Sequence, residues 1–367
     1  MRPRTKALVA AGSGITLGLA GLALSALPAG ADDEPVLPEI GAEALVASAL
    51  AAEAPAFAGV AELKNELGLP AVPGTEALDF ETVRVFHDGA EGARVQVERK
   101  ASELTFVKNA EEAWAYDSQE RTAKGLTWDA ADADAMRGHA EAELADPSQA
   151  AAEIIERLRP TSDIFVDGTA QVADRAAYEL VLTPKPSEKT LLREITVAID
   201  AETRIPLRFD VFANGTTDPV LSLGFVELEL GAQDADLFEF TPPKGAEVET
   251  TEADDAAGAL RDAGGEDAVE QRTTTVGDGW DTVVIGEVPA EVPSAGSFEG
   301  GPQGGQDLGG ILEQIGTPVS GEFGSGTHVQ VAVGGVVLTD DGRIAAGAVP
   351  RQVLVDALDT FDDTARQ

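Results

Sequence analysis

The chain of 367 residues contains no cysteine. Disulfides, thiol catalysis and thiolate metal sites are therefore excluded, and so is a lipid anchor attached through a cysteine. A folded state of this chain must depend on the burial of apolar side chains rather than on covalent cross-links.

Basic residues are scarce, with 26 Lys and Arg against 65 Asp and Glu and a formal net charge of -39. A chain this acidic is repelled by nucleic acids and by anionic lipid surfaces, so we expect no nucleic-acid partner. The three histidines, His87, His139 and His328, show no metal-ligand spacing, and no stretch matches a calcium-binding loop. We therefore expect neither a metal nor a cofactor.

Catalytic motifs are absent as well. The chain has no G-x-S-x-G elbow, no phosphate-binding loop and no G-x-G-x-x-G. Pairs of carboxylates are inevitable among so many acids, but nothing marks one pair as the acid and base of a hydrolase. We expect a protein that is not an enzyme, and a hydrolase with unassigned carboxylates is the weaker alternative.

The first 31 residues have the organisation of an export signal. Arg2, Arg4 and Lys6 precede an uncharged run over residues 7–27, and Ala29 and Ala31 form an A-x-A cleavage site. The pattern predicts cleavage after Ala31 and a secreted or cell-envelope location. The alternative is an uncleaved anchor, because a run of this length can span a bilayer.

Apolar periodicity predicts a few helices among many strands. Helices are expected over 42–54, over 129–145 and over 146–159, the last with Asp146 as its N-cap and Pro147 in its first turn. From Phe80 the period changes to two, and short strands at close spacing predict an antiparallel meander.

Strands resume after residue 175. Asn214-Gly215 has the sequence of a type I′ hairpin turn. The apolar phase of the following strand slips by one residue near Gly224–Val226, which predicts a β-bulge that curls the sheet. The stretch DLFEFTPPKGAEV is expected to hold a last strand with Phe238 and Phe240, which Pro242 and Pro243 end.

The composition divides the mature chain into three parts. Residues 36–248 carry the strand series, 249–275 are interpreted as an acidic linker with few large apolar residues, and 276–367 as a hairpin-helix module. The last part either forms a small satellite domain or adds strands to the first sheet. The helices over 42–54 and 146–159 can cover the apolar face of the sheet fully, giving a plain core, or loosely, giving an apolar cavity suited to acyl chains.

Four segments in order give the chain a family resemblance. They are the first helix with FAGVAELKNELGLPAVPG, then FVKNAEEAWAYDSQERTA, then the pair VADRAAYELVLTPKP and ITVAIDAETRIPLRFDVF, and finally FEFTPPKGAEV. Residues 40–248 thereby resemble the LolA-type lipoprotein-carrier superfamily, which includes RseB/MucB-type regulators. The likeness is to an exported branch in high-GC Gram-positive bacteria.

The resemblance implies an α+β fold: a strongly curved antiparallel half-barrel with a helical lid, here followed by a small C-terminal β/α module. It implies a non-enzymatic protein that binds lipid or lipoprotein acyl chains in an apolar cavity. The alternative it implies is an envelope-stress regulator that binds the outer domain of a membrane anti-sigma factor. The residues expected to line the cavity are Phe106, Trp114, Leu180, Val197, Phe209 and Phe225.

Overall fold

The computed structural model describes residues 35–68, 80–100, 102–129, 146–253, 273–287 and 316–365, together with 131, 133 and 255. The expected export signal, the expected helix over 129–145 and most of the expected linker lie outside these residues. Within them, no helix is both long enough and apolar enough to cross a membrane.

The described strands form two sheets, and the larger one holds twelve of them. Its members are β1 (Ala56–Asn65), β2 (Thr82–Asp88), β3 (Ala93–Glu98), β4 (Glu103–Lys108), β5 (Glu112–Asp117), β6 (Thr122–Thr127), β7 (Ser162–Val172), β8 (Arg175–Pro184), β9 (Leu192–Asp200), β10 (Pro206–Ala213), β11 (Leu221–Leu230) and β12 (Glu247–Glu252). Their order is β12-β6-β5-β4-β3-β2-β1-β11-β10-β9-β8-β7, so the sheet stays open with β12 and β7 at its edges.

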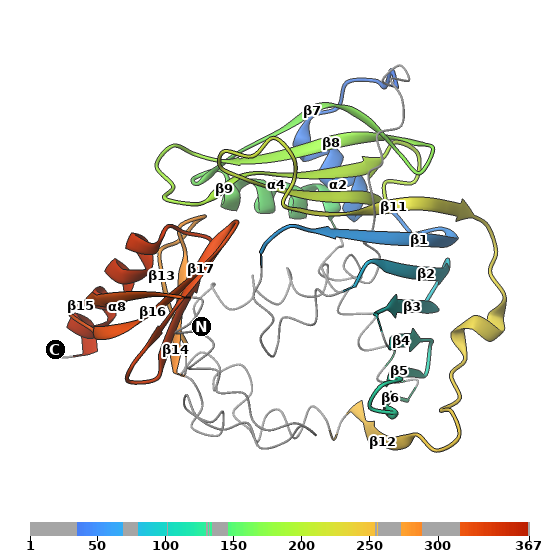
Figure 1. Ribbon diagram of the computed structural model, residues 1–367. Helices are drawn as coiled ribbons and strands as arrows, with labels where there is room; N and C mark the ends of the chain where they lie inside the picture. The colour runs from blue at the N-terminus through green and yellow to red at the C-terminus, as the bar shows by residue number, and fades with distance from the viewer. Residues whose placement is uncertain are drawn as a thin grey trace.

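The large sheet is strongly bent. β7 to β11 and β1 form one limb and β2 to β6 the other (Figure 1). The predicted bulge is confirmed, because Ala61 pairs with Phe225 while the preceding Val60 pairs with Glu227, which leaves Val226 as the extra residue. The sheet is antiparallel apart from β12, as the strand patterning predicts, and is not closed on itself.

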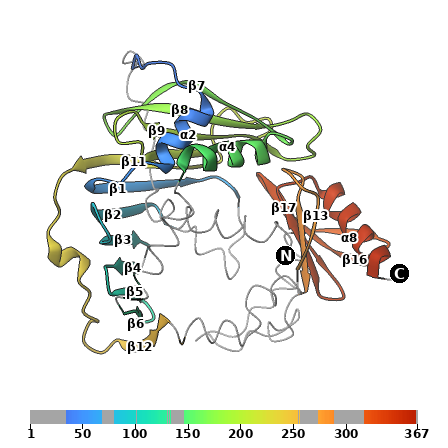
Figure 2. The same cartoon turned by 180° about the vertical axis from the view of Figure 1, so that it is seen from behind.

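Two helices, α2 (Ala42–Leu50) and α4 (Pro147–Leu158), lie on the inner side of the bend (Figures 1 and 2). Leu45 of α2 is fully buried against Tyr178, Leu180 and Ile199 of β8 and β9. Asp146 accepts a hydrogen bond from the backbone of Gln149 at 3.0 Å, as expected of an N-cap.

The expected last strand with Phe238 and Phe240 is wrong. Residues Ala235–Phe238 form a short 3-10 helix, η2, and the next strand is β12 at Glu247–Glu252. The segment between β11 and β12 runs along the outer side of β2 to β6 (Figure 1). Because Pro242 and Pro243 donate no backbone hydrogen bond, they suit this crossing segment rather than a sheet interior.

The turn type expected at Asn214-Gly215 is also wrong. β10 and β11 do pair as an antiparallel hairpin. Gly215 has a φ of +86°, but Asn214 is not among the residues with positive φ. A type I′ turn requires positive φ at both central residues, and here the connection is the longer loop 214–220.

The C-terminal residues form a separate six-stranded sheet and do not extend the first one. Its strands are β13 (Thr273–Val276), β14 (Val283–Glu287), β15 (Thr317–Gly321), β16 (Gly324–Val331), β17 (Gly334–Thr339) and β18 (Arg343–Gly347). Helix α8 (Arg351–Ala365) packs on it over a core that includes Val283, Val337, Leu354 and Leu358.

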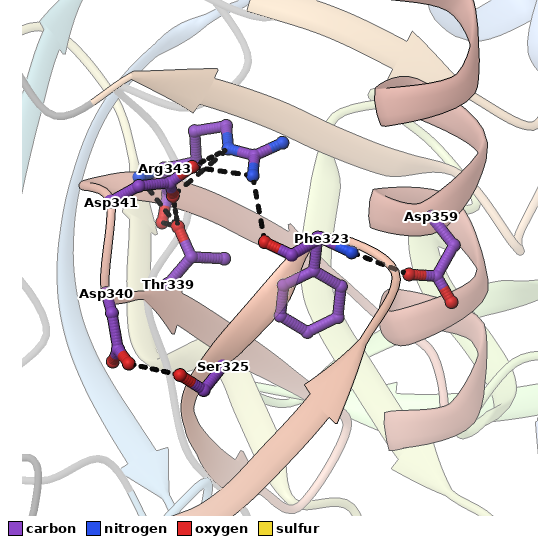
Figure 3. Close-up of polar contacts among 7 residues, drawn as sticks. All are labelled: Phe323, Ser325, Thr339, Asp340, Asp341, Arg343 and Asp359. Carbon is purple, nitrogen blue, oxygen red and sulfur yellow. Dashed lines mark hydrogen bonds and ion pairs between the residues drawn. The ribbon is translucent and has the colours of Figure 1, made fainter.

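Polar contacts fasten the turns of this sheet to one another and to α8 (Figure 3). Arg343 Nη2 donates to Asp341 at 2.7 Å and to the backbone oxygen of Phe323 at 3.3 Å. The backbone nitrogen of Phe323 donates to Asp359 of α8 at 3.1 Å. The β15–β16 turn, the β17–β18 turn and the helix are thereby held in one arrangement.

The second sheet contacts the first through β7, the β8–β9 loop and the loop after β1. Trp280 Nε1 donates to the buried Ser162 Oγ at 2.7 Å, and its backbone nitrogen donates to Glu188 at 3.0 Å. The backbone oxygen of Ala348 accepts from the Thr190 hydroxyl at 2.7 Å. Ala332 donates to the backbone oxygen of Leu67 at 2.9 Å. A small apolar cluster joins the two sheets as well, because Leu67, Ala213 and Val220 pack against Ala332 and Val333.

Candidate ligand-binding face of the sheet

A row of apolar side chains crosses the limb that carries the helices. Leu180, Val197, Phe209, Leu223 and Leu63 are successive cross-strand partners on β8, β9, β10, β11 and β1. Partners in an antiparallel pair share a face, so all five point to the side on which α2 lies. Leu180 is buried directly against the α2 cluster.

The same face continues onto the other limb as a second apolar row. Val85, Val95, Phe106 and Ala115 are cross-strand partners on β2 to β5, and Val85 pairs with Gly59 of β1. Gly59 and Leu63 are four residues apart on one strand, so the two rows lie on one continuous face of the sheet. We call the two rows together the inner apolar face.

Exposure varies along the inner apolar face: Leu180 and Leu63 are buried, whereas the other positions apart from Val85 and Phe106 are half-buried. Val85 is 3% exposed, whereas Phe106, two strands further on, is 44% exposed. Large aromatic side chains are normally buried on folding, so an exposed phenylalanine in line with a buried row is a specific feature. The inner apolar face is therefore partly core and partly surface, and Phe106 is its most exposed side chain.

The structure brings five of the six predicted lining residues onto this face. Leu180, Val197 and Phe209 belong to its first row and Phe106 to its second. Phe225 pairs with Ala61 between them, is 1% exposed, and meets Phe57 edge-to-face with ring centroids 5.9 Å apart. The exposed fraction of a side chain distinguishes a core residue from one that a ligand can contact. Of these five residues, only Phe106 is exposed.

Trp114 does not share the inner face. It pairs with Val107, the neighbour of Phe106, and therefore points to the opposite side of the sheet. Its ring lies 5.5 Å from that of Phe240 in the crossing segment, and it covers Gly125 of β6. The six predicted residues thus do not share one face, and the residues of the inner apolar face that the prediction missed are Leu63, Leu223, Val85, Val95 and Ala115.

The outer face of the helix-bearing limb is polar and charge-paired. Arg208 donates to Glu179 and to Asp210, each at 2.8 Å, and Ser222 donates to Asp210 at 2.5 Å. Burial raises the pKa of Glu179, and the nearby Arg208 opposes that rise. Every carboxylate of this group has a donor, which suits a structural network that fastens β8, β10 and β11 together.

A second buried ion pair fixes the β9–β10 turn. Asp200, 1% exposed, accepts two bonds from Arg175 at 2.5 and 3.0 Å and bonds from the backbone and hydroxyl of Thr203. Burial alone would raise the pKa of Asp200, but these hydrogen bonds outweigh it and hold that pKa below its usual range. Across the described ranges no set of three His, Asp or Glu side chains is grouped to hold a metal ion.

Comparison with known proteins gives structural likeness only. No protein-family model and no curated protein matches the chain. A Pseudomonas aeruginosa MucA/MucB complex contains a chain similar over 86% of this chain and 94% of its own, at 16% identity and a TM-score of 0.40.

An uncharacterized conserved protein from Thermus thermophilus is similar over 56% of this chain and 95% of its own, at 14% identity and a TM-score of 0.31. A LolA-superfamily protein from Nitrosomonas europaea is similar over 55% of this chain and 99% of its own, at 11% identity and a TM-score of 0.21. At this level the likenesses assign neither a family nor a function to the chain.

Proposed function

We propose that the chain is an exported, non-enzymatic protein that binds the acyl chains of a lipid or lipoprotein on its inner apolar face. The observation that carries this proposal is the continuous apolar face that begins beneath α2 and includes the exposed Phe106. An acyl chain is long, flexible and apolar, so its binding needs a continuous apolar strip and no polar partner along its length.

The energetic contribution of Phe106 can be approximated. A phenylalanine side chain buries about 150–250 Å² when fully covered, and 44% of Phe106 is exposed. At about 25 cal/mol per Å², covering the exposed part contributes about 2 kcal/mol, or about thirtyfold in affinity.

A matched pair of variants tests the proposal. Phe165 is 38% exposed and pairs with Val181, so it points to the outer face, opposite to Phe106. We expect Phe106→Ser to weaken the binding of a fluorescent fatty acid by at least tenfold and Phe165→Ser to leave it unchanged. Equal effects of the two substitutions, measured by fluorescence titration on folded protein, would show that the inner face is not the site.

Native mass spectrometry of the secreted protein, followed by organic extraction, gives a direct test. A co-purifying lipid would identify the ligand class. A mass equal to that of the polypeptide alone, together with failure to take up the fluorescent fatty acid, would contradict the proposal. In the same measurement, a mature mass beginning at Asp32 would establish export with cleavage after Ala31.

A second candidate is a regulator that binds the outer domain of a membrane anti-sigma factor. The observation that favours it is the separate C-terminal sheet, which has a core of its own and joins the first sheet through polar contacts and one small apolar cluster. Under this hypothesis the two sheets are distinct domains, and the expected linker 249–275 is shorter than the composition indicated, because residues 249–252 belong to β12 and residues 273–275 to β13. A pull-down with the outer domains of membrane proteins distinguishes this function from lipid binding. The regulator hypothesis expects that capture of such a domain requires the C-terminal sheet.

A further inference from the structure

β12 is bound differently from the other strands of the large sheet. It pairs with β6 in parallel, from Glu247 opposite Thr122 to Glu252 opposite Thr127, while the other described pairs of that sheet are antiparallel. All six of its side chains are exposed. Lys124 and Glu249 approach to 3.9 Å, but both side chains are mostly exposed, so this pair contributes little.

The retention of β12 on β6 therefore depends on the backbone ladder. Parallel pairing is slightly less stable per residue than antiparallel pairing, and a strand without buried side chains adds no apolar burial. β12 is also the terminal strand at its edge of the described sheet, so it is held from one side.

The segment just before β12 is anchored firmly, in contrast. Phe238 is 5% exposed and its backbone oxygen accepts a bond from the Asn109 side chain at 3.1 Å. The backbone oxygen of Leu237 accepts from Arg94 at 3.1 Å, and Phe240 packs on Trp114. β12 is thus a weakly held strand that follows a firmly anchored segment. The anchored segment keeps β12 at a high local concentration beside the edge of β6.

Release of β12 would uncover a row of backbone donors and acceptors on β6, and such a row is a template for strand addition. We propose that the β6 edge is a binding site for an extended segment of a partner protein, and that β12 occupies this site until the partner displaces it. The surface beside the edge carries Lys124 and Arg121, and the latter donates to the backbone oxygen of Lys244 at 3.2 Å.

The chemistry of the site limits the partner segment. A carboxylate at the position facing Lys124 would replace that of Glu249. The formal charge of -39 opposes the approach of a segment that is acidic along its whole length. The segment that fits is therefore extended and free of proline, with an acidic residue at the Glu249 position, as in β12 itself.

Hydrogen exchange of the full-length wild type is the first test, because it needs no variant. We expect the amides of β12 to exchange at least tenfold faster than those of β5, which is paired on both sides. Equal protection of β12 and β5 would overturn the proposal, since it would make β12 an integral strand of the sheet.

The second test offers the edge a peptide. Val248→Pro/Thr251→Pro in the full chain removes backbone donors at positions of opposite parity, so at least one belongs to the β6 ladder. Both side chains are exposed, and Val248→Ala/Thr251→Ala is the matched control that trims them but keeps the donors. The probe is a fluorescein-labelled peptide of residues 244–253, KGAEVETTEA, in 0.15 M salt.

We expect the proline variant to bind this peptide at least tenfold more tightly than the alanine control does, measured by fluorescence anisotropy. No binding by the folded proline variant would contradict the proposal, as would equal binding by both variants, which would place the peptide elsewhere. Fatty-acid binding is unaffected in either case, so the outcome is independent of the proposed lipid site.

Discussion

Gly59 offers a sharp test of how the sheet is bent. A Cβ added at Gly59 would lie 2.7 Å from Cδ1 of Phe225 and closer still to its Cε1, and it would be 3.3 Å from the backbone oxygen of Glu227. Phe225 is 1% exposed, packs edge-to-face on Phe57 and lies at the β-bulge. The buried ring cannot turn out into solvent to make room.

We expect Gly59→Ala to lower the free energy of unfolding by about 1–3 kcal/mol, the usual range for overpacking a core. Without the clash the sign would be opposite, because alanine in a strand interior is more stable than glycine by roughly 0.5–1 kcal/mol. Urea denaturation followed by far-UV circular dichroism measures the change. A neutral or stabilising result would refute the reasoning.

A double-mutant cycle with Phe225→Leu isolates the contact. Leucine leaves room beside residue 59, so Gly59→Ala should be at least 1 kcal/mol less destabilising in the Phe225→Leu background, within the range of about 0.5–3 kcal/mol known for residues in contact. Additive effects of the two substitutions would mean that the loss at Gly59 has another cause.

Three further predictions concern the polar contacts. Trp280→Phe leaves the buried hydroxyl of Ser162 without its partner and should destabilise the protein by about 1–3 kcal/mol, whereas adding Ser162→Ala should recover much of this loss in thermal unfolding. Asp200→Asn should lower stability at pH 7 but have a smaller effect at pH 3, since the lowered pKa of Asp200 contributes stability that is complete above the unfolded pKa and is lost as pH falls from there through the folded pKa. Burial and the nearby charge of Arg351 lower the pKa of His328, whose Nε2 has no hydrogen-bond partner. The unfolded chain therefore takes up a proton below about pH 6.5 that the folded chain resists, and stability of the C-terminal sheet should fall from pH 7 to pH 5 in wild type but not in His328→Phe.

The strand pattern could be predicted because it depends on local periodicity. Alternation of apolar and polar residues placed β2 to β5 and β8 to β11, and Asp146 with Pro147 placed the start of α4. The phase slip near Gly224–Val226 predicted the bulge because an extra residue in one strand shifts every later side chain to the other face.

The wrong predictions share one physical cause: contacts between distant segments decided which face each aromatic ring lies on. The expected strand at Phe238 and Phe240 has the alternation of a strand, but those rings pack on Trp114 and on the Gly92 region of the outer face instead of joining the sheet. Trp114 was likewise grouped with Phe106 because both are large and apolar. Their separation onto opposite faces depends on β4–β5 register, in which Phe106 pairs with Ala115.

The sequence by itself determined the absence of cross-links, the strong negative charge, most strands, the start of α4 and the bulge. All of these depend on composition or on residues close together in the chain. Only the tertiary structure decided that the C-terminal strands form their own sheet, that β12 pairs in parallel with the distant β6, and that Phe106 of the inner apolar face is exposed. The reason is that pairing partners and exposure are set by contacts between distant segments, whose free energies do not appear in any local pattern.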